Sequence, residues 1–120
     1  MLTTAYEAET GALSTYRAVV ARLGEVGPFP NVVTSEQRHV ATISQLFTTY
    51  GLTTPSPAAG VSSPSTLHAA CELGVSTEEH LVAMYEQSMA KVASDPVLTR
   101  AFDNLRAASE ESHLPAFEHC

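Results

Sequence analysis

The stretch Ser35-Glu36-Gln37-Arg38-His39 decides the expected fold. Glu36 and His39 lie three residues apart in a segment whose apolar residues have helical spacing. Side chains three apart on a helix point the same way, so this carboxylate and imidazole can reach one metal ion. The same Glu-x-x-His pattern returns at Glu110 and His113. Two such pairs, in a chain with only five histidines, favour a metal site more strongly than one pair does.

The spacing of apolar residues predicts four helices in a single domain that spans residues 1–120. Gly51 is expected to end the second helix as a C′ glycine. Two readings of the third helix stay open, because it either continues through Gly74 or restarts at a capping box beginning with Ser76. The expected helices cover residues 3–23, residues 30–50, residues 66–94, and the chain from Pro96 onward.

A long connection separates the second and third expected helices. Residues 52–65 are rich in Pro, Ser and Thr, and about 14 residues reach up to about 46 Å when extended. A helix of 20 residues is only about 30 Å long, so this segment can cross the whole length of a bundle. The expected fold is therefore all-α, a ferritin-like four-helix bundle with one long crossover connection between helices 2 and 3. The alternative is a loosely attached insertion.

Other glutamates on the apolar stripes complete a possible ligand set. Di-metal carboxylate sites in such bundles take one Glu from each of two helices and a Glu-x-x-His from each of the other two. Glu9 lies on the stripe of the first helix, and Glu78 lies near the centre of the third, with Glu79 at its edge. The plainer alternatives are a first-turn acid for Glu9 and a capping residue for Glu79. The fourth helix places Glu110 and His113 towards one edge of its stripe, and a π-bulge could rotate them inward.

The expected heights of these residues agree in one hairpin and conflict in the other. Glu78 and Glu110 should lie within about 3 Å of one level, because the turn between their helices is short. In the first hairpin Glu36 should lie level with Tyr16, and Glu9 about 10 Å away. Glu9 can join the site only if the break between the two helices absorbs that offset.

Composition excludes several classes of protein. There are 13 acidic residues against 6 basic ones, and the net charge of −7 argues against binding to nucleic acid. No apolar run of about 18 residues predicts a membrane span. No signal peptide is visible, so we expect a soluble protein, either cytoplasmic or exported with a leader absent from this chain. There is no Cys-x-x-Cys motif. Whether Cys71 pairs with Cys120 stays open. The last two residues, His119 and Cys120, are expected to form a frayed end.

Several short motifs follow one another along the chain. They are Gly27-Pro28-Phe29, Asn31-Val32, Ser35-Glu36-Gln37-Arg38-His39, Tyr50-Gly51, Leu73-Gly74, Glu78-Glu79, Asn104-Leu105, His113-Leu114 and Ala116-Phe117. In these motifs and their order the chain resembles a small ferritin-like family of archaea and bacteria, which is catalogued as a domain of unknown function and is related to rubrerythrin, bacterioferritin and ferritin. The resemblance implies metal-site positions at Glu9, Glu36, His39, Glu78 or Glu79, and His113, and Glu110 completes the second Glu-x-x-His of the superfamily.

The function expected from these residues is that of a di-metal carboxylate protein. The cofactors would be two divalent transition-metal ions, with iron first and manganese or zinc as alternatives. The activity would be ferroxidase, oxidoreductase or peroxide chemistry, with O₂ or peroxide as partner, and a homodimer is the default by analogy. Two alternatives remain open, namely a metal-free helical bundle that acts as an interaction module and a protein that binds divalent metal without redox chemistry.

Overall fold

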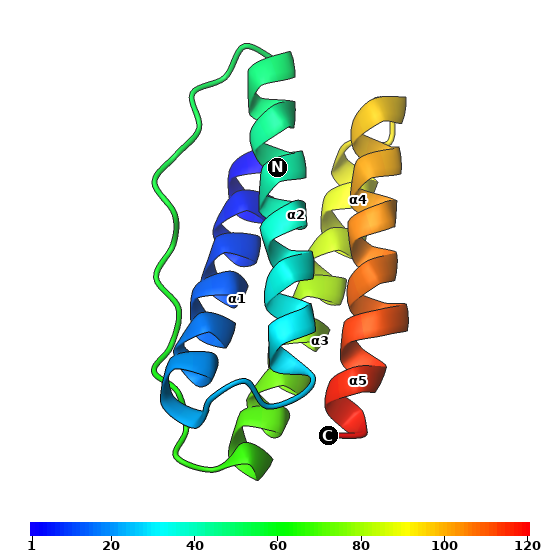
Figure 1. The fold of residues 1–120 in the computed structure, drawn as a ribbon. Coiled ribbons are helices and arrows are strands. Elements are labelled where there is room, and N and C mark those ends of the chain that lie inside the picture. Colours follow the sequence, from blue (N-terminus) through cyan, green and yellow to red (C-terminus); the bar gives the residue numbers. More distant parts are fainter. The chain divides into compact units, whose positions relative to one another are not determined.

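The computed structural model describes all of residues 1–120, and its regular structure is entirely helical (Figure 1). The all-α prediction is confirmed, and the helix bounds lie within three residues of those predicted. None of the helices is both long enough and apolar enough to cross a membrane. The elements are α1 (Leu2–Leu23), α2 (Phe29–Thr49), α3 (Leu67–Lys91), α4 (Pro96–Ala108), the π-helix η1 (Ser109–His113) and α5 (Leu114–Glu118).

The chain forms two compact units. The N-terminal unit, residues 2–70, contains the hairpin of α1 and α2, and the connecting segment, residues 50–66, that leads to α3. The C-terminal unit, residues 71–120, contains most of α3 together with α4, η1 and α5. Each unit buries its own acidic side chains, so each can be examined for a site of its own.

Helix α2 ends at a C′ glycine, as predicted from the sequence. Gly51 adopts a positive φ of 66°, a conformation that other residues rarely adopt. The Gly51 N–H donates to the Thr48 carbonyl at 3.0 Å, and the Leu52 N–H donates to the Phe47 carbonyl at 2.8 Å. These two bonds form a Schellman motif, which satisfies carbonyls that the helix end would otherwise leave without donors.

The connecting segment lies along α1 (Figure 1). The Ala58 N–H donates to the Thr10 hydroxyl at 2.9 Å, and the Val61 N–H donates to the Thr15 hydroxyl at 3.1 Å. A Cβ added to Gly60 would lie 2.4 Å from the Thr15 nitrogen, so only glycine allows this close approach. The segment is therefore attached to α1 at several points, which differs from the loosely attached insertion that the sequence left open.

The register of the first hairpin differs from the predicted one. Tyr16 packs edge-on against Phe29, with ring centroids 6.0 Å apart, and does not lie opposite Glu36. Glu9 precedes Tyr16 by seven residues, and Glu36 follows Phe29 by the same number, so this register brings the two glutamates level. The segment between Leu23 and Phe29 removes the expected difference in height between Glu9 and Glu36. It runs back along the hairpin, so that α2 begins beside the last turns of α1 and not beyond its end (Figure 1).

The fourth predicted helix is regular at its start and irregular at its end. Asp95 caps α4 by accepting hydrogen bonds from the backbone N–H groups of Val97 and Leu98, at 3.0 and 3.1 Å. A π-helical turn then follows α4, where the wider turn accommodates one additional residue. The buried residues are consequently four apart through η1, at Leu105, Ser109, His113 and Phe117.

The C-terminal end of the chain is fixed to α3 at two successive levels. Cys71 and Cys120 form a disulfide with a Cα–Cα distance of 5.9 Å, so the predicted frayed end is wrong. A Cβ at Gly74 would lie 2.5 Å from the ring of Phe117, so the glycine gives the ring its place against α3. Helix α3 continues through Gly74 without a break, which decides between the two readings of the sequence.

Candidate metal centre

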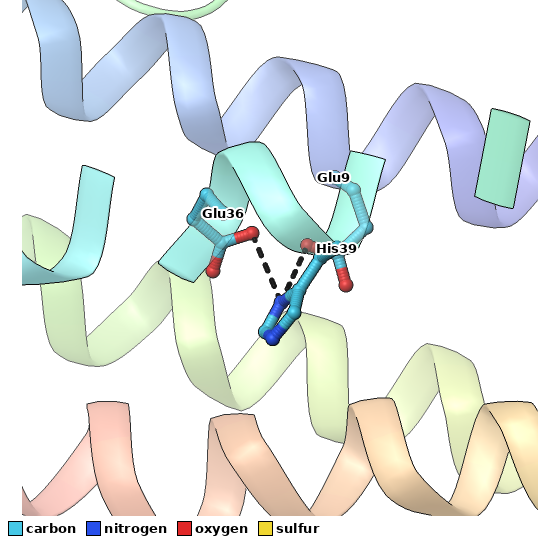
Figure 2. Close-up of side chains that lie close together, drawn as sticks. All are labelled: Glu9, Glu36 and His39. Carbon is cyan, nitrogen blue, oxygen red and sulfur yellow. Dashed lines mark ion pairs between the residues drawn. The ribbon is translucent and has the colours of Figure 1, made fainter. Parts of the chain in front are cut away.

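The N-terminal unit brings Glu9, Glu36 and His39 together (Figure 2). Nδ1 of His39 lies 3.6 Å from a carboxylate oxygen of Glu9 and 3.5 Å from one of Glu36. One donor atom from each of the three side chains lies within 4.8 Å of the others. Both carboxylates have no exposed surface, and the imidazole is 12% exposed. Fully buried glutamates are rare unless they are paired, so this cluster is unusual for a small domain.

A serine orients the imidazole of this cluster. The Ser35 hydroxyl lies 3.3 Å from Nε2 of His39, one helical turn earlier on α2. With Nε2 occupied in this way, Nδ1 is the ring nitrogen that faces the two carboxylates. Fixing one ring nitrogen through a hydrogen bond is how proteins set the orientation and tautomer of a metal-binding histidine.

The electrostatics of the cluster favour bound protons when no cation is present. Burial, followed by the charge of Glu36, raises the pKa of Glu9 to about 8. Burial alone would lower the pKa of His39, but its contacts with Glu36 and Glu9 outweigh that effect and raise the pKa to about 10. At neutral pH the cation-free cluster therefore carries a proton on both Glu9 and His39, and the imidazolium stands between the carboxylates.

The C-terminal unit holds a second buried carboxylate and imidazole. Nδ1 of His113 lies 3.1 Å from a carboxylate oxygen of Glu78, and both side chains are buried. Glu78 is one helical turn beyond Gly74 on α3, and His113 is one turn before Phe117. The disulfide, the packing of Phe117 on Gly74, and the Glu78–His113 contact thus occupy three successive levels of the same helix pair.

Two of the residues predicted for the site lie outside the buried sets. Glu79 is exposed, whereas Glu78 is buried, so the structure distinguishes the two neighbours that the sequence could not. Glu110 has a 47% exposed side chain and forms an ion pair with Arg106 one turn earlier. Glu79 and Glu110 both line a surface groove of about 430 Å³, together with Glu86. The predicted inward rotation by a π-bulge applies to His113 and not to Glu110.

Ser109 was not among the residues predicted for a site. Because of the π turn, Ser109 lies on the buried face together with His113, and Glu110 lies away from that face. In a continuous α-helix, Glu110 would lie closer to the buried face. Ser109 has no exposed surface, and its hydroxyl has no hydrogen-bond partner in the chain. The spacing of four from Leu105 to position 109, and again from His113 to Phe117, was the available sequence signal.

The donor chemistry of both buried sets fits a divalent transition metal. Carboxylate oxygens suit hard cations such as Mn²⁺, and imidazole nitrogen suits iron and zinc, so the mixture matches the metals expected from the sequence. Glu9, Glu36 and His39 could hold one ion, while Glu78 and His113 supply two donors towards another. A bound cation would displace the protons on Glu9 and His39 and would neutralise the buried carboxylates.

No protein-family model, curated protein or solved structure matches the chain.

Proposed function

We propose that the protein is a di-metal carboxylate protein of the ferritin-like kind, with iron as its principal metal. The observation that carries this proposal is the buried cluster of Glu9, Glu36 and His39, with donor atoms within 4.8 Å of one another. The cluster combines two carboxylates with an imidazole whose second nitrogen is held by Ser35. Groups that bind a metal need this kind of support to keep their orientation.

The proposal includes a four-helix bundle in which the connecting segment is the crossover. Two features support that part. The segment is long enough to pass along a whole helix, and it lies along α1 through the hydrogen bonds of Thr10 and Thr15. The proposal further requires that the Glu78–His113 pair supply ligands to the second ion, as the other half of such sites does.

A metal-free interaction module explains the buried acids less well. Burying a carboxylate is costly unless charge or hydrogen bonds compensate it, and three glutamates of this chain have no exposed surface. The raised pKa of Glu9 records that cost, with burial as its largest cause. A bound divalent cation removes the cost of burying these carboxylates without requiring that they be protonated. If the core were purely structural, apolar residues of similar size would stabilise it more.

The chain's own residues would bind and orient the metal and exclude water from it. Bound iron would supply one-electron redox chemistry with O₂ or peroxide. Glu9 and Glu36 would provide negative charge, and His39, fixed by Ser35, would provide a neutral nitrogen after losing its proton. Tyr16 and Phe29 close the apolar side of the hairpin two turns along α1 from Glu9.

The test is an O₂-consumption experiment on protein loaded anaerobically with Fe(II). Two Fe(II) ions reduce one O₂ to hydrogen peroxide, with two protons taken from solvent, so we expect O₂ uptake faster than that of Fe(II) in buffer. Glu36→Gln should abolish the excess, and the exposed Glu86→Gln should retain it. Fe(II) binding without excess O₂ uptake would instead indicate non-redox metal binding, and no metal binding would indicate the interaction module.

A further inference from the structure

A groove on the N-terminal unit is lined by none of the residues of the Glu9, Glu36 and His39 cluster. It has a volume of about 330 Å³, which is within the range of binding sites for small molecules. Helices α1 and α2 form two of its walls, and the connecting segment forms the third. The apolar part of its lining consists of Tyr6, Leu13, Val40, Pro57 and Ala58.

Contacts within the chain hold the walls of this groove in place. The Ala58 N–H donates to the Thr10 hydroxyl at 2.9 Å, which fixes the connecting segment against α1. The ring of Tyr6 packs edge-on against Phe47, with ring centroids 5.8 Å apart. A ligand that enters a preformed groove orders few side chains, which lowers the entropic cost of binding.

Arg17 is the cationic side chain of the groove, and the chain does not neutralise it. Its guanidinium forms no ion pair or hydrogen bond, whereas Arg106 pairs with Asp103 and Glu110. Arg17 and Gln37 line this groove and also a neighbouring one of the same size, so both side chains stand where the two grooves meet. The N–H groups of a guanidinium match the geometry of a carboxylate, and an amide side chain supplies a further donor.

The surface charge of the N-terminal unit also favours an anion. Four of the 13 acidic residues belong to this unit, and two of them, Glu9 and Glu36, are fully buried. Its three arginines are all exposed, so they outnumber the two exposed glutamates. The groove of the C-terminal unit is lined instead by Glu79, Glu86 and Glu110. Of these two grooves, the one beside Arg17 suits a negatively charged group.

We propose that the groove beside Arg17 binds a small amphipathic carboxylate of the fatty-acid class, with its carboxylate on Arg17 and Gln37 and its alkyl chain along the apolar lining. Tyr6 precedes Arg17 by 11 residues, or about 16 Å along α1, so the lining accommodates an alkyl chain of medium length. The neighbouring groove is less suitable, because Glu25 lines it. Binding at this place requires no metal and is independent of the proposed di-metal function.

The experiment is a titration of the full chain, disulfide intact, with decanoate below its micelle concentration, followed by calorimetry and amide NMR spectra. Treatment with chelator beforehand ensures that no bound metal competes for the carboxylate. We expect a dissociation constant below about 1 mM and amide shifts that centre on Leu13, Val40 and Ala58. Decanol, which lacks the charge, and acetate, which lacks the alkyl chain, should each bind about tenfold or more weakly than decanoate.

Variants of exposed residues test the two ends of the ligand separately. Arg17→Gln should weaken decanoate binding by about tenfold or more and leave decanol binding unchanged, because only the charged hydrogen bonds are lost. Arg22→Gln is the matched control, since Arg22 is an exposed arginine of the same helix that lines neither groove, and it should bind decanoate normally. Ser14→Trp places a large side chain in the groove and should weaken the binding of both ligands.

Three results would overturn the proposal. The first is the absence of decanoate binding. The second is an equal affinity for decanoate and decanol that Arg17→Gln does not change, which would indicate non-specific association of the alkyl chain. The third is a set of concentration-dependent shifts at the same amides without ligand, because a second copy of the chain would then occupy the groove. None of these results depends on a bound metal, so they are distinguishable from a failure of the proposed function.

Discussion

The two units reach a similar local arrangement, a histidine Nδ1 facing a buried carboxylate, by different means. In the N-terminal unit two regular helices bring Glu9 to the Glu36–His39 pair, and Ser35 holds the imidazole. In the C-terminal unit a π turn rotates His113 to Glu78, and covalent and aromatic contacts hold the helix end. In a regular helix, a Glu-x-x-His motif keeps its two side chains on one face, as Glu36 and His39 do. In the π turn, the residue buried with His113 is Ser109 and not the glutamate of the motif.

Removal of the disulfide from the C-terminal unit should have the largest effect, because this bond has no counterpart in the N-terminal unit. The bond joins residues 49 apart, and the loop-entropy account gives it about 4 kcal/mol of stability. We expect the double variant Cys71→Ser, Cys120→Ser to lose about that much unfolding free energy in urea, followed by circular dichroism. An unfolding free energy equal to that of the unmodified chain would contradict a stabilising role of the disulfide in this unit.

Removing a carboxylate from the N-terminal set should weaken metal binding. Glu36→Gln preserves the size of the side chain and removes its charge. We expect Co(II) binding to weaken by about 100-fold, or about 2.7 kcal/mol, and calorimetry of the chelator-treated chain measures the change. Glu79→Gln is the control, since Glu79 is exposed on α3. Unchanged Co(II) affinity in Glu36→Gln would mean that the ion binds elsewhere.

The aromatic contact in the C-terminal unit can be tested with a single methyl group. In Gly74→Ala the new Cβ would lie 2.5 Å from the ring of Phe117, so the ring must move. Overpacking of this kind costs typically about 1–3 kcal/mol, and we expect a loss of that size in thermal or urea unfolding. Gly27→Ala provides the comparison, because nothing lies within 4 Å of its added Cβ. Equal stability of the two variants would show that α5 is not fixed by this contact.

The pH dependence of the chelator-treated chain tests the electrostatics of the N-terminal set. Glu9 has a pKa raised to about 8 and His39 one raised to about 10, so the folded chain binds more protons than the unfolded chain between their ordinary values and these values. The stability from both groups is fully present at low pH and is lost as the pH rises through about 8 for Glu9 and about 10 for His39. Each group contributes a slope of about 1.4 kcal/mol per pH unit between its ordinary and its raised pKa, so we expect the unfolding free energy to fall by roughly 2 kcal/mol per pH unit from pH about 6 to about 9. Glu9→Gln should flatten the lower part of that slope, and a free energy that rises with pH would contradict the account.

The amino-acid sequence is sufficient to predict the helices, because glycine, proline and apolar spacing act locally. Gly51 ends α2 through its positive φ, and Asp95 with Pro96 starts α4, as their residue types indicate. The burial of Glu36 and Glu78 also follows from the stripes on which they lie. These features depend on neighbours within a turn or two of the same helix.

Features that depend on how helices meet were not predictable in the same way. The level of Glu9 depends on where α2 begins relative to the end of α1, and the packing of Tyr16 on Phe29 sets that register. Gly74 reads as an interruption, but in the structure it makes room for Phe117 from the other end of the unit. The burial of Ser109, and not Glu110, comes from a π turn that no single residue indicates.

Metal content is the most direct test of the di-metal site, because both buried sets are proposed to hold a cation. The protein would be purified without chelator, supplied with Fe(II) under anaerobic conditions, desalted, and analysed by inductively coupled plasma mass spectrometry beside Glu36→Gln. We expect up to about two equivalents of iron per chain and a marked loss in the variant. Less than about half an equivalent of any transition metal in the unmodified chain, before and after Fe(II) addition, would contradict the account.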